Sequence, residues 1–221
     1  MRSARAAPRR RVAAPRNVRI IGGQFKRTPL PVADLPGLRP TPDRVRETLF
    51  NWLAHLVPDW AALRGLDLFA GTGALGLELA SRGACAVTLV EREPQLVAQL
   101  QALCERLGTR AVQVLRGDAL ALAARLPVAG FDLVFVDPPF GARLHEPALR
   151  AVRPLLAPGG WVYVESDAAL PAALLDALGL TVVRELRAGR VQARLLQAAQ
   201  PAPPSEPDKG QVDCPPPGLS R

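Results

Sequence analysis

Short apolar segments alternate with amphipathic segments of helical spacing from Leu63 onward, and this alternation restricts the fold more than any other feature. Each apolar segment has the length of one strand and each spacer has room for one helix. Such a pattern is typical of a parallel sheet covered by helices on both faces, with right-handed crossovers. We expect strands at 64–69, 86–91, 111–116, 131–137 and 160–165, and helices at about 74–82, 93–107, 118–125 and 146–156.

The pattern changes near the carboxyl end of the chain. Two further strands are expected from Leu180 to Leu186 and from Val191 to Gln197, with only residues 187–190 between them. Because no helix separates these strands, they must pair as an antiparallel hairpin. A Rossmann-like α/β fold with a seven-stranded, mostly parallel sheet that ends in such a hairpin is the pattern of class I S-adenosylmethionine-dependent methyltransferases. Ordinary dinucleotide-binding folds lack the hairpin.

The amino-terminal part carries different local signals. Residues 19–25 and the Pro-rich stretch after them predict a short strand or hairpin and then a loop. Thr41-Pro42-Asp43 predicts a helix start, because Thr41 or Asp43 can cap a helix and Pro42 suits its first turn. We therefore divide the chain into a disordered basic arm (1–17), an N-terminal hairpin and lid helix (18–62), a methyltransferase domain (63–198) and a disordered Pro-rich tail (199–221).

Positive charge is concentrated in the first quarter of the chain. Residues 1–50 contain 12 Lys or Arg and 3 Asp or Glu, whereas residues 51–221 contain 16 and 17. Of the 28 basic residues 26 are arginine, and this bias explains the choice of arginine over lysine but not the clustering. A basic segment attached to a nearly neutral domain predicts a polyanionic partner that is held through its phosphates.

The composition also excludes several classes of protein. No apolar run approaches the roughly 20 residues that a membrane span needs, and the Arg-rich start lacks the apolar core of a secretory signal. An organellar transit peptide has a similar composition and stays open as an alternative. Cys85, Cys104 and Cys214 show neither C-x-x-C spacing nor companion histidines, so we expect no disulfide framework, no metal site and a cytoplasmic protein.

The segment from Asp67 to Gly76 predicts a strand end, a glycine turn and a helix start that together would hold a nucleoside cofactor. Gly71 and Gly73 allow positive φ and a close approach of the backbone to a ligand, and Gly76 lets the helix lie close to the sheet. The spacing Gly-x-Gly-x-x-Gly also matches NAD enzymes. No Lys-Ser or Lys-Thr pair follows it, which excludes a P-loop.

Two of the three acidic residues at these strand ends, Asp67 and Asp118, favour S-adenosylmethionine over NAD. Asp67 would attract the methionine ammonium and repel a pyrophosphate, and Glu91 ends the next strand, where a carboxylate accepts hydrogen bonds from ribose hydroxyls. Asp118 follows the third strand and could accept from the adenine N6 amine, or it could serve only as a helix N-cap. The cofactor-binding residues that we expect are Asp67, Phe69, Ala70, Gly71, Thr72, Gly73, Glu91, Asp118, Ala119 and Asp137.

The sequence Asp137-Pro138-Pro139-Phe140 ends a continuous apolar strand. Prolines cannot donate to a sheet ladder, so the strand must stop there in a rigid turn. Such a turn gathers a carboxylate, backbone carbonyls and an aromatic ring at the carboxyl end of a strand, where α/β sheets bind ligands. This arrangement suits a planar base with an exocyclic amine. The alternative is an ordinary proline turn with Phe140 in the core.

Several motifs together resemble the RsmD family of bacterial 16S ribosomal RNA guanine-N2 methyltransferases. These motifs are residues 19–25, 37–52, 67–76 and 136–140, and the resemblance covers about residues 18–197. The segment 39–52 is the most specific to this family. The resemblance implies a cytoplasmic monomer that methylates the N2 amine of a guanine in 16S ribosomal RNA, within the assembled or assembling small ribosomal subunit, with S-adenosylmethionine as the methyl donor.

The resemblance also implies roles for single residues. Asp137 and the Pro138 carbonyl would accept hydrogen bonds from the guanine N2 amine, and Phe140 would stack on the flipped base. These three residues form the expected catalytic set. The expected RNA contacts are Arg39, Thr41, Arg44, Arg46, Pro139 and Phe140, and Arg39, Thr41, Asp43, Arg44 and Glu47 would form a lid over the cofactor and the base.

Other functions stay open at this point. An NAD-dependent oxidoreductase would leave residues 137–140 without a role. An RNA-binding factor with a decayed methyltransferase fold would bind RNA regardless of S-adenosylmethionine, and a methyltransferase for DNA or for protein glutamine would use the same chemistry. His55 and His145 could be general bases, but a surface or packing role for His55 and a loop role for His145 fit the sequence better. Glu165 ends a strand at the ligand-facing edge, where it could support the site.

Overall fold

The computed structural model describes residues 17–199 apart from 36–37, 39, 140 and 190. Most of the expected basic arm, nearly all of the expected tail, and the two site residues Arg39 and Phe140 lie outside the described residues. The strands are β1 (Asn17–Arg19), β2 (Pro29–Pro31), β3 (Arg64–Asp67), β4 (Ala86–Glu91), β5 (Val112–Arg116), β6 (Phe131–Val136), β7 (Leu156–Ser166), β8 (Leu180–Ala188) and β9 (Val191–Ala198). The helices are α1 (Asp43–Leu56), α2 (Gly76–Ser81), α3 (Pro94–Leu107), α4 (Ala119–Ala123), α5 (His145–Val152) and α6 (Ala172–Ala177), with short 3-10 turns at Trp60–Ala62 and Arg153–Leu155.

The main sheet of the described chain has seven strands in the order β5-β4-β3-β6-β7-β9-β8. Strands β3 to β7 run parallel, and β9 lies antiparallel to both β7 and β8, which confirms the expected fold class. The chain runs outward from β3 to β5 and then returns to β6 on the other side of β3. The strand order therefore reverses between β3 and β6, and α/β sheets bind their ligands at the carboxyl ends of the strands beside such a reversal.

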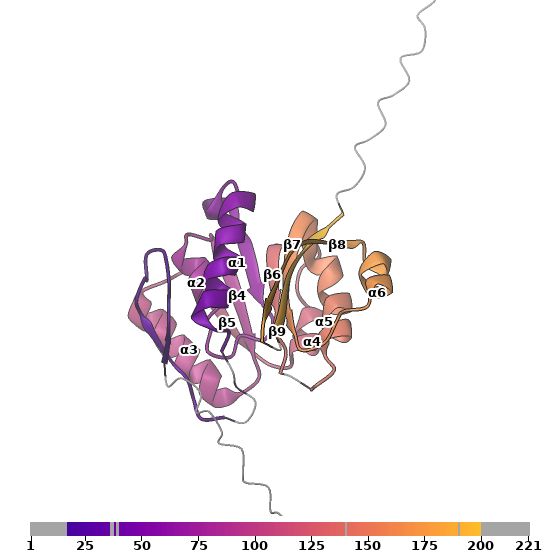
Figure 1. The fold of residues 1–221 in the computed structure, drawn as a ribbon. Coiled ribbons are helices and arrows are strands. Elements are labelled where there is room, and N and C mark those ends of the chain that lie inside the picture. Colours follow the sequence, from indigo (N-terminus) through magenta and orange to yellow (C-terminus); the bar gives the residue numbers. More distant parts are fainter. Residues whose placement is uncertain (1–16, 36–37, 39, 140, 190, 200–221) are drawn as a thin grey trace, which may run out of the picture.

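Helices cover both faces of this sheet, as Figure 1 shows. Residues of α1, α2 and α3 pack against one face, and residues of α4, α5 and α6 pack against the other. Strand β6 lies in the middle: Leu133 and Phe135 belong to the first core, and Val134 and Val136 to the second. All four side chains are fully buried, and the burial of each contributes about 1.5–3 kcal/mol of hydrophobic stabilisation. This position explains why the segment is a continuous apolar run.

The amino-terminal hairpin, formed by the antiparallel strands β1 and β2, is bound to α2. The carboxylate of Glu78 accepts the backbone N–H of Ile21 at 2.6 Å and of Gly22 at 2.9 Å. Ser81 accepts from the backbone N–H of Phe25 through its hydroxyl oxygen. Gly23 has a φ of 74°, and a Cβ at this position would lie 1.8 Å from the carbonyl oxygen of Ser81. The hairpin therefore approaches α2 too closely for any other residue at position 23.

Three elements differ clearly from the sequence-based expectation: α6, β7 and α5, which ends at Val152 instead of near residue 156. Helix α6 lies where no helix is predicted, because its six residues are too few to show a helical period. Strand β7 begins at Leu156, four residues earlier than expected. Pro158-Gly159-Gly160 reads as a turn in the sequence, but Leu156 pairs with Phe131 across an irregularity in the β6–β7 register.

The start of α1 also differs from the expectation. The helix begins at Asp43 with Pro42 at the N-cap position, and no side chain caps it, so the capping roles predicted for Thr41 and Asp43 are wrong. Both side chains bind partners elsewhere in the fold. Thr41 donates to Asp137, and Asp43 accepts from Arg46.

Candidate active site

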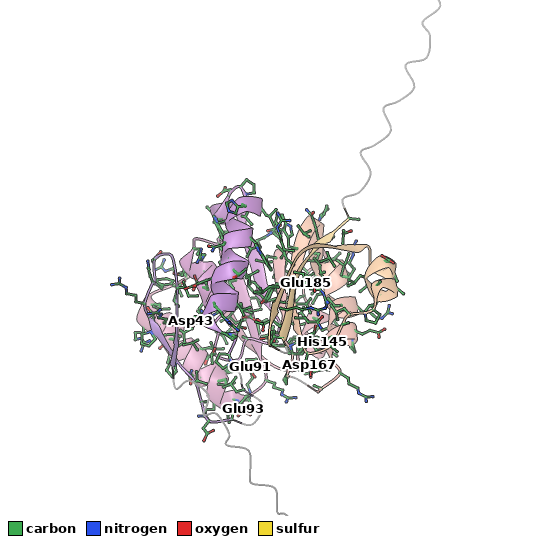
Figure 2. The ribbon with its side chains drawn as sticks, in the orientation of Figure 1. Asp43, Glu91, Glu93, His145, Asp167 and Glu185 are labelled. Carbon is green, nitrogen blue, oxygen red and sulfur yellow. The ribbon has the colours of Figure 1, made fainter. Side chains whose placement is uncertain are left out.

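A cavity of about 350 Å³ opens at the carboxyl ends of β3, β4, β6 and β7. It lies at the reversal of strand order, and Figure 2 shows the labelled Glu91, His145 and Asp167 along this edge of the sheet. The expected site residues that line the cavity are Thr41, Asp67, Phe69, Ala70, Gly71, Thr72, Glu91, Asp118, Ala119, Asp137, Pro138 and Pro139. Gly73, Arg44 and Arg46 are described by the structure but do not line it.

The glycine turn after β3 has the backbone that the sequence predicts. Gly71 and Gly73 adopt φ values of 54° and 79°. The backbone N–H of Gly71 donates to Glu91 Oε2 at 2.8 Å, so the end of β4 fixes the turn. A Cβ on Gly76 would lie 2.2 Å from Leu89, which confirms the close approach of α2 to the sheet. The turn therefore presents a rigid backbone edge to the cavity.

Asp67 places a carboxylate at the floor of the cavity. It is 1% exposed, and its Oδ2 accepts the backbone N–H of Gly76 at 3.0 Å. Burial raises its pKa to about 7, and the nearby charge of Glu91 adds to the rise while the Gly76 hydrogen bond opposes it. A buried carboxylate with an acidic neighbour gains most from a cationic ligand. This electrostatic environment suits an ammonium group and disfavours a pyrophosphate.

Asp118 is the N-cap of α4, as one of the two sequence-based interpretations holds. Its Oδ1 accepts the backbone N–H groups of Leu120 and Ala121, each at 3.0 Å. Both bonds use Oδ1, and Asp118 also lines the cavity, so Oδ2 can accept from a ligand. The cap and the ligand role are therefore compatible in one side chain.

Asp137 directly follows β6 and faces the same cavity. The hydroxyl of Thr41 donates to its Oδ2 at 3.4 Å, which joins the segment before α1 to the end of the sheet. Although part of Asp137 faces the cavity, the surrounding protein desolvates it. Burial raises its pKa well above 3.8, and the charges of Glu165 and Asp67 add to the rise. A carboxyl group with a raised pKa takes up a proton more readily than an exposed aspartate does.

The two histidines lie in different surroundings. His55 is exposed in the last turn of α1, as the sequence-based interpretation of a surface role holds. His145 is the first residue of α5, and its Nε2 lies 2.9 Å from the carbonyl oxygen of Glu165, so the loop role expected for it is wrong. Glu165 is 2% exposed, lines the cavity and accepts a hydrogen bond from Tyr163 that no sequence pattern indicates.

Arg46 has no access to RNA in this structure. Its side chain is 0% exposed, its Nη2 donates to Asp43 Oδ1 at 2.7 Å and to the carbonyl oxygen of Arg19 at 2.9 Å, and its Nη1 lies 3.8 Å from Glu78 Oε2. The expectation that Arg46 contacts RNA is therefore wrong. The helical period could have shown this, because Arg46 lies three residues before the buried Leu49, on the same face of α1.

Two arginines near the cavity were not among the site residues expected from the sequence. Arg92 is exposed and lines the cavity next to Glu91. Arg143 is exposed in the turn after the proline motif, between the lining residues Ala142 and Leu144, and has a φ of 53°. Arg92 directly follows the end of β4, and this position could have indicated it, because the carboxyl ends of parallel strands share one edge.

In the part of the chain that the structure describes, no group of three or more His, Cys, Asp or Glu side chains could hold a metal ion. Cys85 and Cys104 are free thiols, and Cys214 lies outside the described residues. None of the described helices is long and apolar enough to cross a membrane.

The seven-stranded sheet with its carboxyl-terminal hairpin and the cavity at the strand reversal define a class I methyltransferase fold. Solved structures share it. A putative methyltransferase from Escherichia coli is 40% identical with a TM-score of 0.71, and the match covers 84% of this chain and 99% of that one. A putative methylase from Haemophilus influenzae is 32% identical with a TM-score of 0.68, over 83% and 99% of the two chains.

Sequence comparisons define the family more narrowly. Residues 18–197 match the family model described as Conserved hypothetical protein 95. The chain is 42% identical to Ribosomal RNA small subunit methyltransferase D of Escherichia coli (strain K12) over 186 residues, which are 81% of this chain and 89% of the relative. It is 37% identical to the protein of the same name from Haemophilus influenzae over 81% and 93% of the two chains. The chain belongs to the RsmD family.

Proposed function

We propose that this protein transfers a methyl group from S-adenosylmethionine to the exocyclic N2 amine of a guanine in 16S ribosomal RNA. The observation that carries the proposal is Asp137, a carboxyl group with a raised pKa at the end of β6, where it faces the cavity beside the carbonyl of Pro138. The names of the related small-subunit methyltransferases support the choice of substrate.

The residues of the cavity fit the cofactor. Asp67 would bind the methionine ammonium, and Asp118 would accept from the adenine amine through Oδ2. Glu91 would accept from the ribose hydroxyls through Oε2, which has one bond from Gly71, because its Oε1 already accepts the backbone N–H groups of Arg92 and Glu93. The remaining expected contacts with the cofactor come from the backbone and side chains of Phe69, Ala70, Gly71, Thr72, Gly73 and Ala119. The bound cofactor supplies an electrophilic methyl group on a sulfonium.

The chain's own contribution to the reaction is positioning. The lone pair of guanine N2 is delocalised into the ring, so the amine is a poor nucleophile. Asp137 and the Pro138 carbonyl would accept its two N–H groups and hold the nitrogen in line with the methyl group. The base must leave its stack to enter the cavity, which costs a few kcal/mol and is least costly in a loop of the RNA. Pro139 lies exposed at the rim, and Phe140 keeps its proposed stacking role.

RNA would approach the cavity across an arginine-bearing rim. Arg92 and Arg143 are exposed beside lining residues of the cavity, Arg44 is exposed in the first turn of α1, and arginine binds phosphates in two-pronged geometry. Arg39 and the basic arm of residues 1–17 keep their proposed phosphate contacts. We further propose that residues 18–62 act as a hairpin and lid on the catalytic domain of residues 63–198. The enzyme would act as a cytoplasmic monomer on the assembled or assembling small subunit.

The test is methyl transfer to small ribosomal subunits that lack the modification, with tritiated S-adenosylmethionine and nucleoside analysis of the product. We expect N2-methylguanosine. The Asp137→Ala variant should lose at least about 100-fold in turnover and still bind the cofactor, whereas Asp176→Asn, which removes an exposed carboxylate on α6, should keep full activity. A different methylated nucleoside, or undiminished turnover by Asp137→Ala, would refute the proposal.

A further inference from the structure

We propose that Glu165 is a positioning residue that shares one proton with Asp137 and so sets the pH range in which Asp137 accepts the proton that leaves guanine N2. The inference rests on the proposed function and adds to it a second carboxyl group. Sequence motifs of amino-methylating enzymes end at residue 140, and Glu165 lies on the next strand of the sheet. The structure places the two groups together.

The sheet register brings the two carboxyl groups side by side. Val136 of β6 pairs with Val164 of β7 in parallel register, and Asp137 and Glu165 are the next residues of the two chain segments. Both line the cavity. The hydroxyl of Thr41 donates its one proton to Asp137 Oδ2 at 3.4 Å and so holds Asp137 at the cavity.

A buried tyrosine fixes the second carboxyl group. The hydroxyl of Tyr163 donates to Glu165 Oε1 at 2.9 Å, and Tyr163 itself is fully buried. The imidazole of His145 contacts the backbone carbonyl of Glu165 and leaves its carboxyl group untouched. Glu165 is 2% exposed, and the Tyr163 hydroxyl thus holds its carboxyl group beside the cavity.

The charged groups around the pair are mostly acidic. Asp67 faces Asp137 from β3, and Arg46 acts on Glu165 from α1. Burial raises the pKa of both Asp137 and Glu165, and the charge of Glu165 is the next cause for Asp137. The register places the two desolvated carboxyl groups side by side, where they cannot both ionise at low cost, so the charge of Glu165 opposes the ionisation of Asp137.

The ionisation of Asp137 has a use in the reaction. As the nitrogen forms its bond to the methyl carbon, the sulfur–carbon bond breaks and its electron pair stays on sulfur, which leaves a neutral thioether. The methylated nitrogen then carries one excess proton. Once the shared proton has been released, above the acid limb, Asp137 is ionised and accepts the proton of the nitrogen at a carboxylate oxygen. The pair ends the step with one proton and returns it to water when the product leaves.

The test is the pH dependence of kcat/KM for small subunits at saturating S-adenosylmethionine, between about pH 5 and pH 9. We expect the wild type to lose activity on the acid side as Asp137 becomes protonated. Glu165→Gln keeps the shape of the side chain but removes its negative charge, so the pKa of Asp137 falls and the acid limb moves down by about one pH unit. At a pH below the wild-type limb, the activity of the variant relative to its own plateau should then be about tenfold higher than that of the wild type.

Tyr163→Phe provides a second variant. Without the Tyr163 hydroxyl, Glu165 holds its proton more tightly, and Asp137 therefore ionises more readily. The acid limb should move in the same direction as in Glu165→Gln, by a smaller amount. Asp176→Asn, whose carboxylate is exposed on α6, should leave the limb in place. Cofactor binding and thermal unfolding of each variant show whether the fold is retained.

The outcomes separate the inference from the proposed function. A lower plateau with an unmoved limb in Glu165→Gln would mean that Glu165 only packs the site, and the inference would be wrong. An upward shift of the limb, or a wild-type profile without an acid limb, would overturn it as well. If the wild type makes no N2-methylguanosine at any pH, the proposed function fails instead.

Discussion

Replacement of Asp67 by asparagine is expected to stabilise the unliganded protein above neutral pH and to weaken cofactor binding. Asp67 is buried under the glycine turn, where burial and the charge of Glu91 raise its pKa from 3.8 to about 7. Asparagine has the same shape and keeps an oxygen that can accept the N–H of Gly76. The substitution therefore removes the buried charge and little else.

The magnitude follows from the pKa shift. Because the folded-state pKa lies above the unfolded value, the folded protein binds the proton more tightly, and the contribution of Asp67 to stability falls as the pH rises from about 4 to about 7. A shift of roughly three units corresponds to on the order of 4 kcal/mol of unfolding free energy, all of it lost above about pH 7. The asparagine variant has no such loss.

Urea unfolding of both proteins at pH 5 and pH 8 measures this difference. The stability gained by Asp67→Asn should be larger at pH 8 than at pH 5 by about 3 kcal/mol. Calorimetric titration at pH 8 should show that S-adenosylmethionine binds the variant about tenfold or more weakly, because a charge-assisted hydrogen bond is lost. An equal gain at both pH values would refute the electrostatic reasoning, and unchanged affinity would refute the ammonium assignment.

Three further substitutions test the packing around the site by urea unfolding. Gly23→Ala should destabilise the protein by about 1–3 kcal/mol, since its φ is 74° and its Cβ would overlap the Ser81 carbonyl; a neutral effect would contradict the close approach. Arg46→Met should cost roughly 3 kcal/mol because Glu78 loses a buried counter-charge, and no loss would mean that Arg82 alone neutralises it. Phe135→Ala should cost about 3–5 kcal/mol, against less than about 0.5 kcal/mol for the exposed Val128→Ala control.

Features of the fold that depend on neighbouring residues were predictable. The strand at 86–91 has the predicted bounds, and the helix predicted at 93–107 begins only one residue later. Both were predictable because a strand covered on both faces needs a continuous apolar run and a helix needs a 3.6-residue period. The positive φ values of Gly71 and Gly73 were predictable for the same reason. Turn geometry is a local property of the backbone.

Features that depend on distant partners were not predictable. Thr41 was expected to cap α1, and its hydroxyl instead binds Asp137, 96 residues further along the chain. Arg46 was expected at the RNA, and the ion pair with Glu78 keeps it inside. In both cases a polar side chain has several acceptable partners by chemistry, and the fold selects one of them. The helical periodicity indicates that Arg46 lies on the buried face of α1, but it gives no information about the partner of Thr41.

The sequence by itself determined the class of sheet, the glycine turn and the strand that ends in Asp137, since each follows from burial patterns and backbone conformations within a few residues. The tertiary structure alone decided which carboxyl groups meet. Asp67, Asp137 and Glu165 come from β3, β6 and β7 and share one cavity because the strand order reverses between β3 and β6. Their mutual repulsion and their raised pKa values exist only in that arrangement, because electrostatic interaction depends on distance in space and on the exclusion of water.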